Sequence, residues 1–302
     1  MVRILLTGGT GQVGLELIRS RGWPENAQLV APARNELDLS DVSAIVEYVA
    51  GGNFAAIINS GAYTAVDRAE SEIVAAWKIN ALAPAGLASA ASAAGIPIVQ
   101  ISTDYVFDGA KREPYCENDA VRPLGVYGAS KEAGEQAVRT SNARHVILRT
   151  AWVYSEHGSN FVKTMLRLAK AAPSIKVVGD QIGSPTSAVD IAKTVQKITL
   201  SLINHRAAPT GTYHFTNSGD GSWFDFASEI FRLCGSLRGT SPVLEEIRTF
   251  EYPTAAKRPA NSTLSHEKIM ADYGVNPRHW KDALSDVMAS LLASEVLREE
   301  ER

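Results

Sequence analysis

Cysteine is nearly missing from this sequence, which contains only Cys116 and Cys234 among its 302 residues. Two cysteines cannot form a disulfide framework, so the composition favours a reducing compartment and we expect a cytoplasmic protein. A surplus of positive charge is missing too, because the net charge is −3 and the isoelectric point is near 6.1. Without a basic stripe to follow a phosphate backbone, the chain is not expected to bind nucleic acid.

Long apolar segments are the third absence. Met1 leads directly into RILLTGG, without a basic stretch followed by a long apolar run, so we expect no signal peptide. We also identify no run of the roughly eighteen or more apolar residues that a membrane helix needs, and we expect no membrane partner. The small-residue run LAPAGLASAASAAG (82–95) contains Pro84 and Gly86 and is predicted to be a tightly packed helix.

The first half of the chain contains short β-branched runs that alternate with helical patterns. The runs are almost continuously apolar, as strands buried on both faces are. They lie at 2–9, 27–33, 55–62, 96–103 and 145–154. Strand–helix alternation at this spacing predicts an α/β fold with a doubly wound parallel sheet. Ligands bind at the carboxyl ends of such strands, so functional residues are expected just after each run.

After about residue 155 the pattern changes to helices separated by short strands. Helices are predicted at 160–172, 187–203, 222–235 and 264–273, with a last one after Pro277. We therefore divide the chain into a dinucleotide-binding Rossmann domain, 1–155, and a smaller α/β lobe, 156–302, that closes over the edge of the sheet. Helices of this lobe such as 187–203 are expected to pack back on the first domain.

A glycine-rich turn, TGGTGQVG (7–14), follows the first predicted strand and opens the first helix. Gly8, Gly11 and Gly14 stand three residues apart, with Gln12 and Val13 between the last two. This spacing allows a tight turn, close approach of a pyrophosphate, and close packing of the helix on the sheet, and the helix N-terminus faces the phosphates. The motif predicts a bound dinucleotide.

The end of the second predicted strand, APARNELDLSD (31–41), bears on the choice between NADH and NADPH. An acid there would bind the ribose hydroxyls of NADH, whereas an arginine accommodates the 2′-phosphate of NADPH. Arg34 stands where that acid is expected, so the sequence favours NADPH. The alternative is that Arg34 is an exposed loop charge and that Asp38 or Glu36 binds the ribose, which would permit NADH.

Tyr127 and Lys131 lie one turn apart on a predicted helix, so both side chains share a face. The preceding strand delivers Ser102, Thr103 and Asp104 to the same edge of the sheet. A nicotinamide beside these groups suits ketone reduction, in which a positioned acid protonates the carbonyl oxygen. An ammonium roughly 4 Å from the phenol could lower its pKa from ~10 by up to ~3, towards neutral pH. The alternative is a packed Tyr127 beside a solvated Lys131.

These motifs resemble the extended short-chain dehydrogenase/reductase family, through TGGTGQVG, the strand-end Ser-Thr-Asp and Tyr-Gly-Ala-Ser-Lys. Within it, the chain is similar to the family of dTDP-4-dehydrorhamnose reductases. That similarity follows the chain in order through INSGAYTAVDRAE (58–70), ISTDYVFDG (101–109), PLGVYGASKEAGE (123–135), LRTAWVYSEHGSNFV (148–162), VVGDQIGSPTSAVDIA (177–192), GTYHFTNSG (211–219) and RPANSTL (258–264). The resemblance implies reduction of dTDP-4-dehydro-L-rhamnose to dTDP-L-rhamnose by NAD(P)H, and a second lobe that binds the sugar nucleotide.

The resemblance also implies roles for individual residues. Tyr127 would donate the proton, and Lys131 would lower its pKa and bind the nicotinamide ribose. Thr103 would form a hydrogen bond with the carbonyl side of the sugar or with Tyr127. Asp104 and Trp152 would contact the sugar, whose apolar face would lie on the indole. The alternative is that Trp152 only fills the hydrophobic core. The remaining implied cofactor contacts are Ala62, Tyr63 and Thr64 along the cofactor, and Asp38 and Leu39 beside the adenine.

Several points stay open. Some members of the family hold magnesium between glutamates at a dimer interface. Glu16 matches one such position, but Asp190 stands where another glutamate is expected, so we assign no metal ligand and leave both Mg²⁺ and a homodimer open. Gln181 and Arg258 are candidates for binding the diphosphate. A sibling nucleotide-sugar reductase or epimerase would use the same groups. A non-catalytic NADP-binding regulatory subunit of methionine adenosyltransferase type would keep the same fold.

Overall fold

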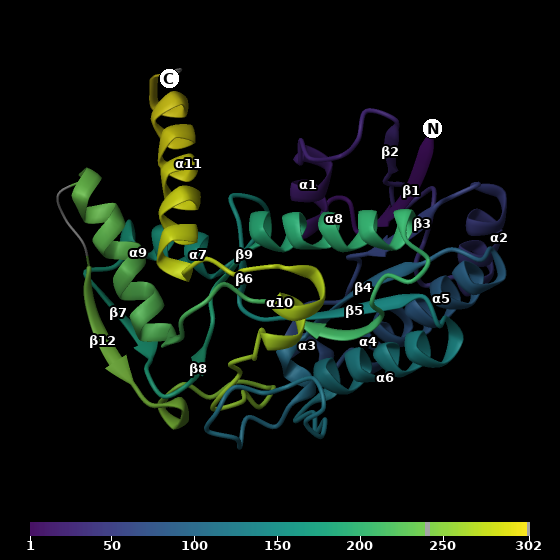
Figure 1. Ribbon diagram of the computed structural model, residues 1–302. Coiled ribbons are helices and arrows are strands. Elements are labelled where there is room, and N and C mark those ends of the chain that lie inside the picture. Colours follow the sequence, from purple (N-terminus) through teal and green to yellow (C-terminus); the bar gives the residue numbers. More distant parts are fainter. Residues whose placement is uncertain (239–241, 301–302) are drawn as a thin grey trace.

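Six parallel strands form the central sheet of the computed structural model (Figure 1), which describes residues 1–238 and 242–300, with side chains for 1–235 and 242–293. Their order is β10–β5–β4–β3–β1–β2, so the strand order reverses at β1 and β3. At such a switch point the loops from neighbouring strands diverge and leave a crevice for a ligand. The strands are β1 (Val2–Thr7), β2 (Ala27–Val30), β3 (Ala56–Asn59), β4 (Ile98–Thr103), β5 (His145–Thr150) and β10 (Gly211–His214).

Successive side chains of the sheet enter two different cores. In β1, Ile4 and Leu6 lie in one core and Leu5 lies in the other, because strand side chains alternate between the two faces. Both faces are covered by helices, which confirms the predicted doubly wound α/β fold (Figure 1). The first face carries α1 (Gln12–Arg19) and α8 (Ala188–Asn204), and the second carries α2 (Val42–Gly51), α5 (Ala83–Ala93) and α6 (Val126–Ser141).

Two of these sheet elements come from the second half of the chain. β10 pairs with β5, from Gly211 beside Val146 to His214 beside Arg149. α8 lies beside α1 on the same face of the sheet and begins within one residue of the helix predicted at 187–203. Segments beyond residue 155 therefore complete the central sheet and its cover.

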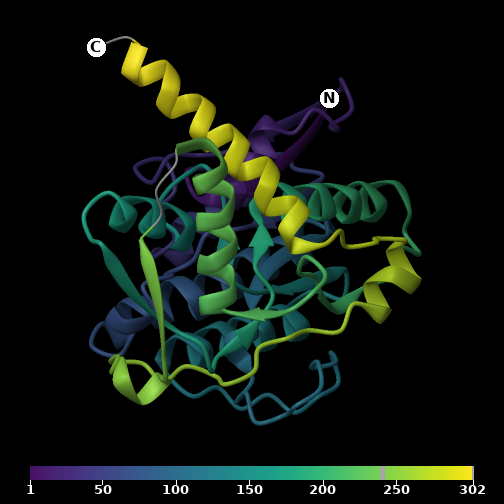
Figure 2. The same cartoon turned by 90° about the vertical axis from the view of Figure 1, so that its left-hand side faces the viewer.

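The rest of the second half packs around a core of its own. Tyr154, Phe226 and Trp280 are among the largest side chains buried there. Figure 2 shows α11 extending beyond the body of the molecule, on the side where the N-terminus also lies. The elements of this region are α7 (Phe161–Ala169), α9 (Trp223–Arg238), α11 (Trp280–Glu300) and the parallel pair β7 (Ser174–Val178) and β12 (Val243–Ile247).

Short elements connect these layers. The short helices and turns are α3 (Val66–Ala69), α4 (Ile73–Trp77), the π-helical turn η1 (Lys78–Leu82), η2 (Asp104–Val106), η3 (Thr249–Glu251) and α10 (Glu267–Tyr273). The short strands are β6 (Val153–Tyr154), β8 (Ile182–Gly183), β9 (Thr186–Ser187) and β11 (Gly221–Ser222).

One helical stretch corrects an expectation from the sequence. Ile73–Ala93 joins α4, η1 and α5, and by length and composition it could cross a membrane, with a mean hydropathy of 1.2. We expected no apolar segment of that length, but Pro84 does not interrupt this one, because it lies at the start of α5, where a helix tolerates a missing N–H group. Half of the apolar window is buried inside the fold, and Ala83 and Leu87 lie in the core with β3. Its last part, α5, is therefore the tightly packed core helix that we expected at 82–95.

Candidate functional site

A cavity of about 1340 Å³ opens at the carboxyl edge of the sheet. The loops that follow β1 to β5 line it, together with residues of α1 and α6. Of the predicted cofactor, catalytic and sugar-contacting residues, only Gly14 does not line it. The residues that do are Gly8, Gly11, Gln12, Val13, Arg34, Asp38, Leu39, Ala62, Tyr63, Thr64, Thr103, Asp104, Tyr127, Lys131 and Trp152. The fold thus brings groups from half the chain into one space.

Gly8 and Gly14 show why the turn after β1 requires glycine. Gly8 has a φ of +73°, and a Cβ atom there would lie 2.6 Å from the backbone nitrogen of Gly61. A Cβ atom on Gly14 would lie 2.1 Å from the Gly8 carbonyl oxygen, so Gly14 allows α1 to pack closely under the turn. Gly11 is the N-terminal cap of α1, and the free N–H groups of that first turn offer a place for a pyrophosphate.

The loop after β2 presents both a cation and an acid to the cavity. Arg34 is exposed and lines the cavity. Asp38 also lines it, but Oδ1 of Asp38 accepts a 2.9 Å hydrogen bond from the Ser40 backbone, and this bond lowers the pKa of Asp38. Glu36 lies outside the cavity, where Oε2 accepts a 2.7 Å bond from the Ala33 backbone. Both acids are therefore engaged by N–H groups of their own turn.

The segment after β3 is held by Asn80, which we did not predict. Tyr63 N donates to Asn80 Oδ1 at 2.8 Å, and Asn80 Nδ2 donates to the Tyr63 carbonyl at 3.1 Å. The same amide nitrogen donates to Ser130 Oγ on α6, at 3.1 Å. Asn80 is buried in η1, and π-helical turns are frequent at functional sites. A hydrophobicity pattern of helical period does not reveal such a turn, which is why this link to the helix of Tyr127 was missed.

Lys131 and Tyr127 both line the cavity from α6. Lys131 is only 4% exposed, so the alternative of a solvated lysine is wrong. Its Nζ donates a 2.7 Å hydrogen bond to the Ile101 carbonyl. Burial lowers the pKa of Lys131 to about 8, and the nearby Glu135 carboxylate opposes that change.

The predicted lowering of the Tyr127 pKa is wrong in this arrangement. Burial is the largest effect and raises the pKa of Tyr127 well above its usual value. The Thr103 hydroxyl acts in the opposite direction, and the charge of Asp104 raises the pKa further. The expectation failed because it treated the attraction of one ammonium as decisive, although the cost of moving a phenolate out of water is larger here. Tyr127 is therefore fully protonated at neutral pH, which a proton donor requires.

Asp104 is the most deeply buried acid of the cavity, at 2% exposed. Thr103 Oγ1 donates to Asp104 Oδ1 at 2.9 Å. Within the described part of the chain, Asp104 Oδ2 has no hydrogen-bond partner. Burial raises the pKa of Asp104 to about 6, against the effect of its hydrogen bonds.

Trp152 lines the cavity in an unusual backbone conformation. Its φ is +47°, a region that bulky residues rarely adopt. The indole stacks on Trp223 of α9, with ring centroids 3.5 Å apart and planes 7° from parallel. A Cβ atom at Gly183 would lie 2.4 Å from the indole, so glycine is needed there. Trp152 is half-buried at the cavity wall and is not simple core filling. Trp223 was not predicted, because only the tertiary fold brings it to Trp152.

The two candidates for the diphosphate lie outside the cavity and are held by protein groups. Gln181 Nε2 donates to Thr249 Oγ1 at 3.1 Å. Arg258 Nη2 donates to Asp67 Oδ2 at 2.6 Å, and its Nη1 donates to the Tyr105 hydroxyl at 3.3 Å. Gln181 is thus held by a structural partner, whereas Arg258 also bonds Tyr105, which lines the cavity next to Asp104.

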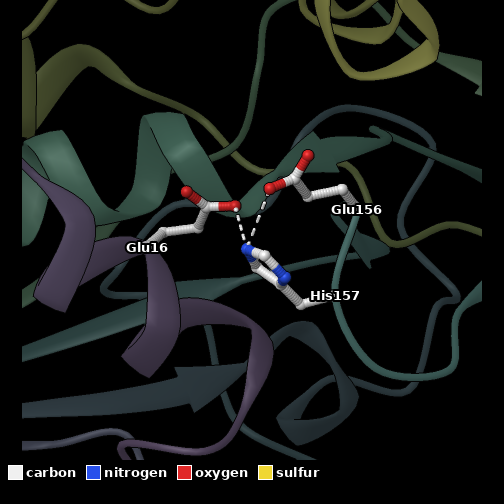
Figure 3. A group of neighbouring side chains, drawn as sticks. All are labelled: Glu16, Glu156 and His157. Carbon is white, nitrogen blue, oxygen red and sulfur yellow. Dashed lines mark ion pairs between the residues drawn. The ribbon is translucent and has the colours of Figure 1, made fainter. Parts of the chain in front are cut away.

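Glu16 belongs to a separate polar group (Figure 3). Ligand atoms of Glu16, Glu156 and His157 all lie within 4.8 Å of one another. Arg19 Nη1 lies 2.5 Å from Glu156 Oε1 and 2.9 Å from His157 Nε2. A metal ion here would meet the positive charge of that guanidinium, so these residues do not fit magnesium. Asp190, the other position of the family pattern, accepts a 2.7 Å bond from an arginine just before α11.

Comparison with known proteins agrees with this geometry. The family model described as RmlD substrate binding domain matches residues 2–293. The dTDP-4-dehydrorhamnose reductase of Sinorhizobium fredii is 40% identical, over 96% of this chain and 98% of the relative. A crystal structure of such a reductase from Clostridium acetobutylicum has a TM-score of 0.89 and 41% identity, covering 96% of this chain and 100% of that one. The reductase of Bacillus anthracis, solved in complex with NADP, has a TM-score of 0.88 and 37% identity over the same shares. The chain therefore belongs to the RmlD substrate binding domain family, as a relative of the dTDP-4-dehydrorhamnose reductases.

Proposed function

We propose that this protein reduces the 4-keto group of a dTDP-linked sugar, converting dTDP-4-dehydro-L-rhamnose into dTDP-L-rhamnose with hydride from NADPH. The observation that carries the proposal is that one cavity is lined both by the glycine turn of α1 and by Thr103, Tyr127 and Lys131. Its volume of about 1340 Å³ exceeds that of most single-ligand sites and suits two large ligands side by side. The relatives that carry the reductase name support the choice of sugar.

The nicotinamide supplies the hydride when the cofactor is bound. Tyr127 holds its proton at neutral pH, so the phenol can donate it to the carbonyl oxygen as negative charge develops there. Lys131 lies one helical turn away, and its ammonium favours the phenolate that remains. Thr103 offers a second hydroxyl beside Tyr127, which can orient the carbonyl. Trp152 offers an indole face to the apolar side of the sugar ring.

NADPH is the proposed cofactor because Arg34 lines the cavity, whereas Glu36 does not and Asp38, which does, already accepts a bond from the Ser40 backbone. A guanidinium matches a phosphate in geometry and charge. The related reductase from Bacillus anthracis was solved in complex with NADP, which supports the same choice. The proposal assigns no metal ion to Glu16, Glu156 and His157, since Arg19 already supplies the positive charge beside the last two.

The proposal extends to the organisation of the molecule. Residues 1–155 bind the dinucleotide and supply Thr103, Asp104 and Trp152 to the sugar. Residues 156–302 complete the sugar-nucleotide site, because the Trp152–Trp223 stack joins the cavity to the core of the second half. The near absence of cysteine supports a cytoplasmic location. A homodimer is the proposed assembly, and light scattering of the purified protein tests it.

The test is to follow oxidation of NADPH, and separately of NADH, with freshly prepared dTDP-4-dehydro-L-rhamnose, and to identify the product. Turnover to dTDP-L-rhamnose with a preference for NADPH is expected. A different sugar product would favour a sibling reductase or epimerase. Tight NADPH binding without turnover on any keto sugar would contradict the proposal and favour a regulatory subunit.

A further inference from the structure

The pairing of β3 with β4 stops at the edge of the cavity. Ile57 N donates to the Pro97 carbonyl at 3.0 Å, and the two strands stay in register up to Asn59, the last residue of β3. Since the backbone groups on one edge of a strand recur every second residue, the ladder would continue with a bond from the Gly61 N–H group to the Ile101 carbonyl. Among the described residues, the Gly61 N–H group donates instead to Asn59 Oδ1, at 3.2 Å.

The Ile101 carbonyl, which the ladder does not reach, accepts from two side chains. Lys131 Nζ donates to it at 2.7 Å, and Gln100 Nε2 donates to it at 2.8 Å. A carbonyl oxygen has two lone pairs, so these donors fill it, and a third donor would have to displace one of them. Lys131 reaches the carbonyl from α6 on a flexible stem, whereas Gln100 belongs to β4 itself. The ammonium is therefore the donor that a Gly61 N–H group would displace.

We propose that Asn59 is a positioning residue for Lys131. Its side chain binds the Gly61 N–H group, ends the β3–β4 ladder one step early and so reserves the Ile101 carbonyl for the ammonium. Asn59 itself does not line the cavity, so it acts through the groups that it holds. The inference rests on the proposed function, in which the Lys131 ammonium favours the phenolate of Tyr127.

Asn59 is fixed in the orientation that this role requires. It is fully buried, and Thr7 Oγ1 at the end of β1 donates to the same Oδ1 atom that accepts from Gly61. Asn59 Nδ2 donates to Gln100 Oε1 at 2.7 Å. Two donors meet the oxygen and one acceptor meets the nitrogen, so the amide has one favoured orientation. The ends of β1, β3 and β4 are thereby tied together next to the carbonyl that binds Lys131.

The ammonium depends on this carbonyl because burial disfavours its charge. Lys131 is 4% exposed, and burial lowers its pKa to about 8. The Glu135 carboxylate, one turn along α6, opposes that change, but it also accepts from Arg149 Nη2 at 2.7 Å. Loss of the Ile101 carbonyl as an acceptor would therefore lower the pKa of Lys131 further. The other titratable side chains that the end of β4 and α6 bring to this part of the cavity are Asp104, Tyr105 and Tyr127.

The experiment follows the titration of the Lys131 ammonium by ¹³C NMR of labelled lysine side chains, with Lys131→Met to identify its signal. In Asn59→Ala the Gly61 N–H group is free to bind the Ile101 carbonyl, so the midpoint should fall from about pH 8 to about pH 7. The proposed reaction uses the ammonium, so turnover at about pH 8.5 should fall about tenfold. Asn59→Asp keeps an acceptor for Gly61, so its midpoint should stay at or above that of the wild type.

The matched control is Asn142→Ala. Asn142 is also buried, and its Oδ1 accepts from the backbone N–H group two residues on, that of Arg144, at 2.8 Å, but it lies outside the cavity, before β5. This variant should lose stability and keep the wild-type midpoint. Asn59→Val fills the space that alanine leaves and should lower the midpoint as Asn59→Ala does, which covers a failure of the alanine variant to fold.

An unchanged midpoint in a folded Asn59→Ala or Asn59→Val would overturn the proposal. An equal fall in Asn59→Asp or Asn142→Ala would overturn it too, because the effect would then come from loosened packing and not from the released Gly61 N–H group. If the wild type turns over no dTDP sugar, the proposed function fails, and the NMR midpoints still decide whether Asn59 positions Lys131.

Discussion

The glycine-turn end of the cavity and its Trp152 end are built in different ways. The first is made of loops that follow adjacent strands, and its shape depends on backbone positions such as Gly8, where a Cβ atom would meet the Gly61 nitrogen at 2.6 Å. The second is made by side chains from distant segments, with Trp152 and Trp223 stacked at 3.5 Å. Cofactor binding thus depends on local backbone conformation, whereas sugar binding is expected to depend on tertiary packing. Substitutions at the two ends should therefore separate the two kinds of binding.

Tyr127→Phe lies between the two ends and should have the largest effect. Removing the phenolic proton should lower turnover by about 10²–10⁴-fold, because a positioned acid contributes that much. Binding of NADPH should stay close to that of the wild type, since the ring is retained. Tyr252→Phe removes the hydroxyl of an exposed tyrosine outside the cavity and serves as the control. Near-wild-type turnover of Tyr127→Phe would remove Tyr127 from the acid role.

Arg34→Ala tests the glycine-turn end. Loss of a charge-assisted contact with a 2′-phosphate is worth about 1.5–3 kcal/mol, so NADPH affinity should fall by about 10–100-fold while NADH affinity changes little. The matched control is Arg21→Ala, which removes an exposed arginine outside the cavity. Titration calorimetry with both cofactors measures the difference. Equal losses for the two cofactors would show that Arg34 does not recognise the extra phosphate.

Trp223→Ala tests the Trp152 end. Without its stacking partner, Trp152 should no longer be held in its left-handed conformation, so KM for the sugar nucleotide should rise about tenfold while NADPH affinity is kept. Unfolding free energy should fall by about 2–4 kcal/mol for loss of a partly buried tryptophan. Trp223→Phe should restore part of the sugar-nucleotide KM and part of the unfolding free energy. Trp77→Ala, at an exposed tryptophan outside the cavity, should change neither the KM nor the unfolding free energy. An equal loss of NADPH affinity in Trp223→Ala would contradict the claim that the two ends of the cavity bind the sugar and the cofactor independently.

The same contrast explains what could be read from the sequence. The alternation of buried strands and helices predicted the sheet, and fifteen of the sixteen predicted site residues line one cavity, because the motifs sit at strand ends. Asn80 could not be predicted, since a π-helical turn has no hydrophobic period. Trp223 could not be predicted either, since nothing near it in the chain indicates its contact with Trp152. The pKa of Tyr127 was predicted in the wrong direction, because burial depends on the whole fold.

The smallest predicted effect concerns His266, which joins the C-terminal segment to the end of the central sheet. Its Nε2 lies 2.8 Å from Thr216 Oγ1, just after β10, and accepts from the Thr216 backbone at 3.3 Å. Burial lowers the pKa of His266 from 6.5 to about 4. Between these values the unfolded chain binds the proton and the folded protein does not. Folding stability is therefore full above about pH 6.5 and falls as the pH drops to about 4.

The loss attributable to His266 should be on the order of 1–3 kcal/mol, since each pKa unit corresponds to about 1.4 kcal/mol and partial exposure reduces the effect. His266→Gln keeps an acceptor for the Thr216 backbone but does not titrate, so its stability should decline less between pH 6.5 and 4. Urea unfolding at several pH values measures the difference, and His205→Gln, at an exposed histidine, should follow the wild type. If His266→Gln and the wild type lose stability equally as the pH falls, His266 does not make the contact with Thr216 sensitive to acid. If they diverge while NADPH affinity changes equally with pH in both, the attachment of the C-terminal segment responds to acid independently of the glycine-turn end.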